Sequence, residues 1–140
     1  MVSKALLFPV VALVAWTMVM WAWMYLTRIP AIRSADMKLD PHVPRGEQMA
    51  SLPAPVRWKA DNYNHLMEQP TQFYAVAISL ALIGATAIDV YLAWAYVGLR
   101  VVHSIFQATV NKIEVRFTFF ALSSLVLIGL TARAVMALAS

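Results

Sequence analysis

Polar side chains recur at helical spacing inside a stretch of the chain that is otherwise strongly apolar. Asn64, Glu68 and Gln72 are four residues apart, so in a helix they share one face. Such residues are rare within membrane helices, where by default they mark a binding site or an ionic pairing. We therefore expect this face to point into the protein and to contribute to a polar site.

A second polar set lies in the next apolar stretch. Arg100, His103 and Gln107 are three and four residues apart and again share one helical face. Counted from the same side of a membrane, Glu68 lies roughly 12 Å deep and Arg100 roughly 15 Å deep. Because either charge alone would be costly in hydrocarbon, the sequence predicts an ion pair between Glu68 and Arg100.

Arg116 begins the last apolar stretch on the same side. An acid, a histidine, amides and two arginines at one depth suit a small zwitterionic or anionic molecule. Each residue also has a structural interpretation: a buried Glu–Arg pair can be a clamp, a lone histidine a core residue, and an arginine at a helix end a snorkelling cation. No metal-ligand spacing, glycine-rich phosphate loop or Ser/His/Asp set is present. At this point the sequence is consistent both with a binding site and with a purely structural role for these residues.

Pro70 follows Glu68 by two residues. It cannot donate a hydrogen bond to the carbonyl of Leu66, and it disfavours the helical conformation at Gln69. We therefore predict a bend that leaves carbonyls free beside Glu68. At membrane depth such backbone is tolerated only where it is buried in protein or lines a wet cavity.

The elements that position these residues follow from composition. The 140 residues are 61% hydrophobic and 13% charged, with a mean hydropathy of +0.68, whereas soluble domains are about half apolar and a quarter charged. We predict an all-α, integral membrane four-helix bundle in a single domain. Its predicted spans are residues 5–27, 61–87, 89–110 and 114–139, the first long enough to cross a hydrocarbon core of roughly 30 Å and without a signal-peptide cleavage site.

Residues 28–60 contain five prolines and six Lys or Arg, and we expect them to form a surface loop. The connections between the later spans are short, so consecutive helices are expected to be antiparallel neighbours. Ala77, Ala81 and Ala85 form a row of small residues suited to close helix packing in lipid. The distribution of Lys and Arg predicts a cytoplasmic loop and both termini on the opposite side.

Two function classes are disfavoured by composition. The chain has no cysteine, which excludes disulfides and thiolate chemistry of its own. Its basic residues are scattered through the loop and form no stripe with aromatic residues, so we expect no nucleic-acid partner. The lipid bilayer is the expected partner.

Two segments carry a family resemblance. DNYNHLMEQPTQFY resembles the N-L-x-E-x-P-x-x-F-Y segment of bacterial members of the MAPEG family (membrane-associated proteins in eicosanoid and glutathione metabolism), and LRVVHSIFQATVNKIEVRF resembles that family's third-to-fourth helix segment. Arg100, His103 and Arg116 share the 0, +3, +16 spacing of the microsomal prostaglandin E synthase branch. The resemblance covers essentially the whole chain.

The resemblance implies a homotrimer in a bacterial inner membrane, with glutathione held between subunits near the cytoplasmic side. It implies that Arg116 is the catalytic residue, because a cation beside a thiol favours the thiolate. The implied activity is transfer of glutathione to a hydrophobic electrophile arriving through the bilayer, or reduction of that electrophile. The residues expected to hold or support glutathione are Asn64, Glu68, Arg100, His103, Gln107 and Arg28.

The chain departs from the family pattern at four positions. Catalytic members of the branch have Tyr where this chain has Gln107, hydroxyl residues at Phe117 and Phe120, and Asn at His65. These departures favour an alternative, a non-catalytic structural or accessory subunit of a larger membrane complex. A small transporter or channel along the polar faces is a second alternative, although those faces become apolar toward the far side.

Overall fold

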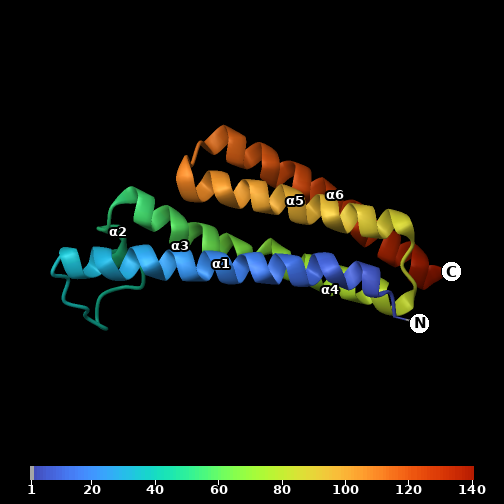
Figure 1. Ribbon diagram of the computed structural model, residues 1–140, viewed down its shortest axis with the longest axis horizontal. Helices are drawn as coiled ribbons and strands as arrows, with labels where there is room; N and C mark the ends of the chain where they lie inside the picture. Colours follow the sequence, from blue (N-terminus) through green and yellow to red (C-terminus); the bar gives the residue numbers. More distant parts are fainter. Residues whose placement is uncertain (1) are drawn as a thin grey trace.

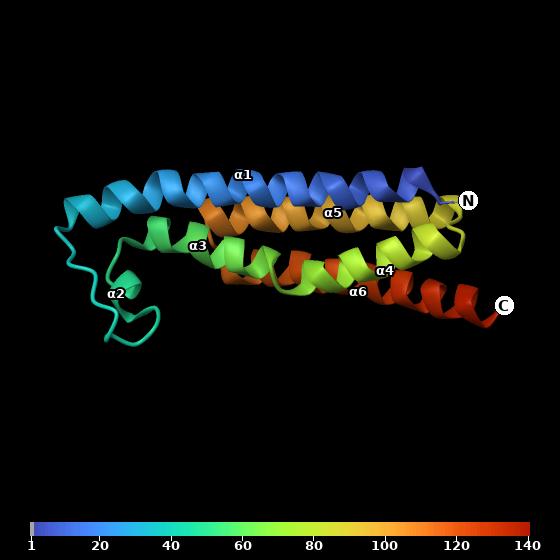
Figure 2. The same ribbon diagram turned by 90° about the horizontal axis from the view of Figure 1, so that it is seen from below.

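The computed structural model describes residues 2–140, and every regular element within them is an α-helix, which confirms the predicted all-α class. The long helices run side by side, and α3 and α4 follow one another end to end (Figures 1 and 2). Both termini lie at the same end of the molecule. In chain order the helices are α1 (Lys4–Ser34), α2 (Glu47–Ala50), α3 (Ala54–Leu66), α4 (Gln69–Ile83), α5 (Ala87–Thr109) and α6 (Ile113–Ala139).

Helix α1 continues past residue 27, where the apolar run ends, as far as Ser34. Arg28 therefore lies in the helix and not in the loop that we expected to begin there. The charge of Arg28 ends the apolar run but not the helix, because arginine is a good helix former. The helix stops before Asp36, whose φ of 47° is left-handed and incompatible with its continuation.

The second predicted span, residues 61–87, is two helices in the structure. Helix α3 begins directly after Pro53, which is not helical, and carries Pro55 in its first turn, where a missing N–H is tolerated. The helix thus starts well before the predicted boundary. Asn62 lies inside α3, where its side chain is buried.

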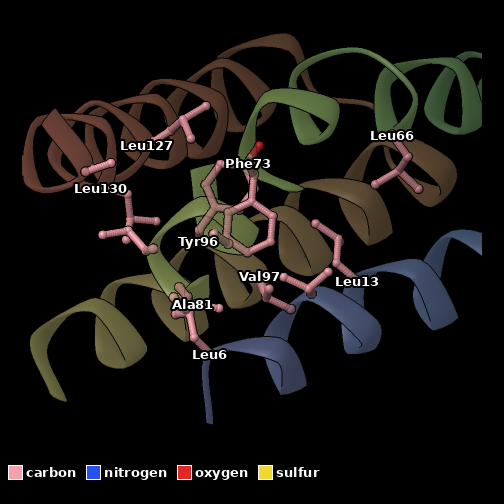
Figure 3. Packing of buried hydrophobic residues seen from close by; sticks show 14 of the residues in the cluster. Leu6, Leu13, Leu66, Phe73, Ala81, Tyr96, Val97, Leu127 and Leu130 are labelled. Atoms are coloured by element: carbon pink, nitrogen blue, oxygen red, sulfur yellow. The ribbon is translucent and has the colours of Figure 1, made fainter. Parts of the chain in front are cut away.

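The core lies where α4 and α5 face each other between α1 and α6 (Figure 3). Phe73 and Tyr96 stack there with ring centroids 4.4 Å apart. Of the predicted row of small residues, Ala77 and Ala81 are buried in this core, while Ala85 lies beyond the end of α4 and is partly buried. The small side chain of Ala81 lets α1 approach closely, and the Ser3 N–H donates to the Ala81 carbonyl (2.9 Å).

A polar clamp closes the end of the molecule that carries the termini. Thr86 and Asp89 form a capping box at the start of α5, and Asp89 is an acidic residue in the first turn of that helix. Asp89 is also buried and forms an ion pair with Arg133 of α6. Arg133 Nη2 donates in addition to the Thr86 hydroxyl (2.8 Å). This clamp fixes α6 against α5 at one end.

Helices α1 and α6 are each long and apolar enough to cross a membrane. Their outward faces carry large apolar side chains, among them Phe8 and Val11 on α1 and Leu125 and Ile128 on α6, all of them exposed. An apolar exterior of this extent is suited to lipid.

Candidate functional site

The helical path breaks between α3 and α4. Glu68 has φ −94° and ψ −101°, outside the helical region. The N–H groups of Met67 and Glu68 reach back only three residues, to the carbonyls of Asn64 (3.0 Å) and His65 (3.3 Å). Pro70 occupies the second position of α4, where it lacks the N–H that would bridge the two helices. The predicted bend is confirmed, and it falls just before the proline.

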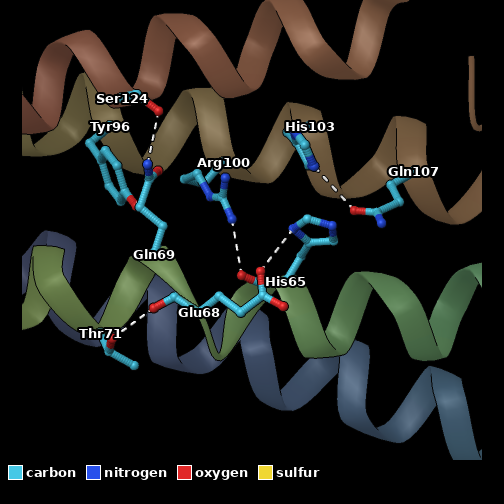
Figure 4. A network of polar contacts seen from close by, with 9 residues as sticks. All are labelled: His65, Glu68, Gln69, Thr71, Tyr96, Arg100, His103, Gln107 and Ser124. Atoms are coloured by element: carbon cyan, nitrogen blue, oxygen red, sulfur yellow. Dashed lines mark hydrogen bonds and ion pairs between the residues drawn. The ribbon is translucent and has the colours of Figure 1, made fainter. Parts of the chain in front are cut away.

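Arg100 reaches this break from α5. Its side chain is 1% exposed, and its Nη2 donates to the main-chain oxygen of His65 at 3.1 Å (Figure 4). The predicted ion pair with Glu68 was wrong, because the Glu68 side chain is 65% exposed and its Oε2 lies 3.5 Å from Nδ1 of His65. The break explains the change of partner: it turns Glu68 outward and leaves the His65 carbonyl outside regular helical bonding, within reach of the guanidinium.

Arg100 keeps unused hydrogen-bonding capacity. Its Nε and Nη1 are buried and have no hydrogen-bond partner within residues 2–140. Its Cζ lies 5.8 Å from the centre of the Phe120 ring, in cation–π range. Buried donors without partners cost free energy, so this guanidinium is suited to an acceptor such as a carboxylate.

His103 lies one turn further along α5 and is 2% exposed. Its Nε2 is 3.1 Å from Oε1 of Gln107, and the imidazole must donate because an amide oxygen only accepts. The ring centroids of His103 and His65 are 5.9 Å apart, so the two histidines face each other across α5 and α3 (Figure 4). The predicted face of Arg100, His103 and Gln107 is thus buried against the end of α3.

A pocket of about 180 Å³ opens beside the two histidines. Arg116 forms part of its wall, and Nη1 of Arg116 donates to Oδ1 of Asn111 in the α5–α6 turn (2.7 Å). The lining residues are His65, His103, Ile113, Arg116, Phe117 and Phe120. The structure therefore brings together two imidazoles and one guanidinium from α3, α5 and α6.

The remaining predicted site residues lie elsewhere. Arg28 and Asn64 line a second pocket of about 230 Å³ among α1, α2 and α3, together with Arg57 and Asp61. Gln72 lies beyond the break and lines a groove of about 660 Å³ between α4 and α6. The predicted single face of Asn64, Glu68 and Gln72 was therefore wrong, because that face requires an unbroken helix.

Sequence reasoning missed a buried polar network beside the pocket. Asn62 is fully buried, and its Nδ2 donates to Oγ of Ser104 at 2.8 Å. The same oxygen accepts a hydrogen bond from Nε1 of Trp16 at 2.9 Å, so three helices meet at one hydroxyl. The signal was the spacing of Asn62, which stands three residues after Lys59 and four before Leu66 on the buried face of α3.

Gln69 is a second polar residue that sequence reasoning did not assign to the site. Its Nε2 donates to Oγ of Ser124 on α6 (2.8 Å), and its Oε1 accepts a hydrogen bond from the Tyr96 hydroxyl on α5 (3.2 Å) (Figure 4). The first residue of α4 is thus held by two other helices, which fixes the break in position.

Comparison with known families identifies the chain at this point. The model of the MAPEG family matches residues 6–136, from the first turn of α1 to the last turns of α6. The chain belongs to the MAPEG family. No curated protein and no solved structure matches it significantly.

In this MAPEG chain the two resemblance segments build the pocket and its surroundings. DNYNHLMEQPTQFY forms the end of α3, the break and the start of α4, and LRVVHSIFQATVNKIEVRF carries Arg100, His103 and Arg116. The positions that depart from the family pattern also lie here. Phe117 and Phe120 line the pocket, and Gln107 is bonded to His103.

Proposed function

We propose that this MAPEG protein binds glutathione between subunits and directs its thiol at a hydrophobic electrophile that arrives through the bilayer. The reaction is a transfer of glutathione to the electrophile or a reduction of the electrophile. The observation that carries the proposal is the pocket shared by His65, His103 and Arg116, with Arg100 packed against its Phe120 wall. Arginine pairs strongly with carboxylates, which glutathione has, and a cation also stabilises a thiolate.

The residues present fit such a ligand. The unpartnered Nε and Nη1 of Arg100 and Nδ1 of His103 offer two donors and one acceptor in a buried setting. Arg116 is the residue that we assign to the thiolate. Glu68, Arg100, His103 and Gln107 shape the site from within one subunit.

The size of the pocket supports a site between subunits. Its volume of about 180 Å³ is below the roughly 300–1,000 Å³ usual for small-molecule sites, so a tripeptide requires a further wall. In the homotrimer that we propose, a neighbouring subunit supplies that wall. Arg28 and Asn64, which line the other pocket of this chain, are our candidates for the contribution from the neighbour.

We further propose four membrane spans, formed by α1, the α3–α4 pair, α5 and α6, in a bacterial inner membrane. The six Lys or Arg of residues 28–60, which lie in the loop and in the adjoining ends of α1 and α3, support a cytoplasmic side for this region, with both termini on the opposite side. Because the chain has no cysteine, single Ser51→Cys and Ser140→Cys variants give an unambiguous test. An impermeant thiol reagent applied outside spheroplasts should label Ser140→Cys alone, and the reverse pattern would reject the orientation.

Calorimetric titration of the purified protein with glutathione tests the binding proposal. We expect saturable binding that weakens by about tenfold or more in Arg116→Ala, since hydrogen bonds to charged groups contribute about 1.5–3 kcal/mol. Arg33→Ala is the matched control, because Arg33 is exposed at the end of α1. Absence of saturable binding at millimolar glutathione would reject the transferase proposal. Unchanged binding in Arg116→Ala would reject only the role of Arg116.

The alternative function is a non-catalytic structural or accessory subunit of a larger membrane complex. It is favoured by Phe117 and Phe120, which give the pocket apolar walls where hydroxyl donors would assist a thiolate. On this alternative the folded protein binds no glutathione and is recovered with a partner protein from gently solubilised membranes.

A further inference from the structure

His65 is the pocket residue that stands where the family pattern has Asn. It lies in the last turn of α3, where the helix dipole favours a positive charge. Its Nδ1 lies 3.5 Å from Oε2 of Glu68. A carboxylate only accepts hydrogen bonds, so this neighbour favours the tautomer with the proton on Nδ1 and leaves a lone pair on Nε2.

The Nε2 atom of His65 is available for chemistry. No side-chain or main-chain group within residues 2–140 forms a hydrogen bond with it, and the imidazole lines the pocket together with Arg116. The side chain is 35% exposed, so an imidazolium here is partly solvated as well as paired with Glu68.

His103 is the competing imidazole, and its surroundings suit it less well. It is almost fully buried, has no carboxylate beside it, and commits Nε2 to Gln107. The charged groups around His65 itself are Glu68 and Asp61 of its own segment, Arg100 of α5 and Arg116 of α6, with His103 facing its ring. Of the two histidines, His65 is the one with a carboxylate in contact to balance a gained proton.

We infer that His65, oriented by Glu68, accepts the proton of the glutathione thiol and so compensates for the hydroxyl donors missing at Gln107, Phe117 and Phe120. This inference rests on the proposed function. In the step, the S–H bond breaks and its electron pair stays on sulfur beside Arg116. The proton forms an N–H bond with Nε2, which yields an imidazolium paired with the Glu68 carboxylate. No oxidant or further reactant is required.

The test is the pH dependence of thiolate formation in the protein saturated with glutathione, followed by the ultraviolet absorbance of the thiolate. His65→Gln is expected to bind glutathione but to shift the midpoint of thiolate formation upward by about one pH unit, which is about tenfold less thiolate at a fixed lower pH. Glu68→Gln should shift it in the same direction by a smaller amount. His42→Gln is the matched control, because His42 is exposed in the loop far from the pocket in sequence, and it should titrate like the wild type.

The outcomes distinguish a failure of the role of His65 from a failure of the proposed function. A His65→Gln protein that binds glutathione and titrates like the wild type would overturn the role of His65 and leave the proposed function standing. A wild-type protein that binds no glutathione would overturn both. If His65→Gln does not fold, Glu68→Gln is the deciding variant, since it keeps the imidazole and alters an exposed side chain. A Glu68→Gln protein whose thiolate titration is unshifted from the wild type would then overturn the inference. An equal shift in His42→Gln would overturn it as well.

Discussion

The main-chain oxygen of His65 accepts a hydrogen bond from Nη2 of Arg100 at 3.1 Å. The contact joins α5 to the point where the chain leaves α3, and it pairs a buried cation with backbone instead of with a carboxylate. Arg100 therefore does not depend on Glu68 for its position. The two residues, which the sequence suggested were partners, should respond differently to substitution.

Glu68→Gln should leave the free energy of unfolding within about 0.5 kcal/mol of the wild type, as for other surface substitutions. The reason is that the Glu68 carboxylate is largely exposed and makes a single contact, with His65. Thermal unfolding in detergent, followed by circular dichroism, measures the change. A loss of 3 kcal/mol or more, the order expected when a buried ion pair is broken, would show that Glu68 is a clamp after all.

Arg100→Met should keep the stability of the ligand-free protein or raise it by about 1 kcal/mol, since replacing a buried charged group by an apolar one of similar volume is often neutral or stabilising. Two of the guanidinium nitrogens have no partner, so their burial is an uncompensated cost. Arg100→Ala is the comparison, and it should lose about 2–5 kcal/mol because it leaves a cavity. Equal losses in both variants would mean that the charge itself stabilises the fold.

Asp89→Asn should destabilise the protein measurably, because it removes the buried carboxylate that pairs with the part-exposed Arg133 guanidinium. A double-mutant cycle with Arg133→Gln measures the coupling, and the double variant should lose less than the sum of the single losses. Glu114→Gln is the matched control, an exposed acid in the first turn of α6. Additive losses would rule out a direct coupling between Asp89 and Arg133.

Asn62→Ala should lose about 1–3 kcal/mol, because it removes the amide that donates to Ser104 inside the protein. Asn64→Ala changes the same residue type two positions away, on the exposed side of α3, and should stay within about 0.5 kcal/mol. The difference between the two thermal unfolding curves is the measurement. Indistinguishable curves would show that the network with Ser104 contributes nothing to stability.

The sequence predicted the helical class, the polar face of α5 and the break near Pro70, because each follows from local chemistry. Helical spacing places Arg100, His103 and Gln107 on one face whatever surrounds them. A proline without an N–H disturbs a helix wherever it stands in the interior. These parts of the fold required no knowledge of neighbouring helices.

The same reasoning could not predict the hydrogen-bond partner of Arg100. A bend has a direction as well as a position, and the direction decides whether Glu68 or a main-chain oxygen meets the guanidinium. Residue types do not encode which carbonyl leaves the regular helical hydrogen-bond pattern. Asn62 was missed for a related reason: the predicted start of the helix was too late, so this buried residue fell at the boundary of the predicted span.

The length of α4 determines how deep in the bilayer a water-soluble reactant and a lipid-soluble reactant would meet. Its 15 residues rise about 22 Å, less than the roughly 30 Å of hydrocarbon in a bilayer. In the four-span arrangement that we propose, with the far end of α4 at the opposite interface, the break and His65 lie just beneath the headgroups of the near leaflet. A water-soluble thiol entering from above and an oily molecule diffusing sideways within that leaflet then arrive at the same level of the protein. The thiol can therefore stay in water and the apolar molecule in lipid until the two meet at the protein.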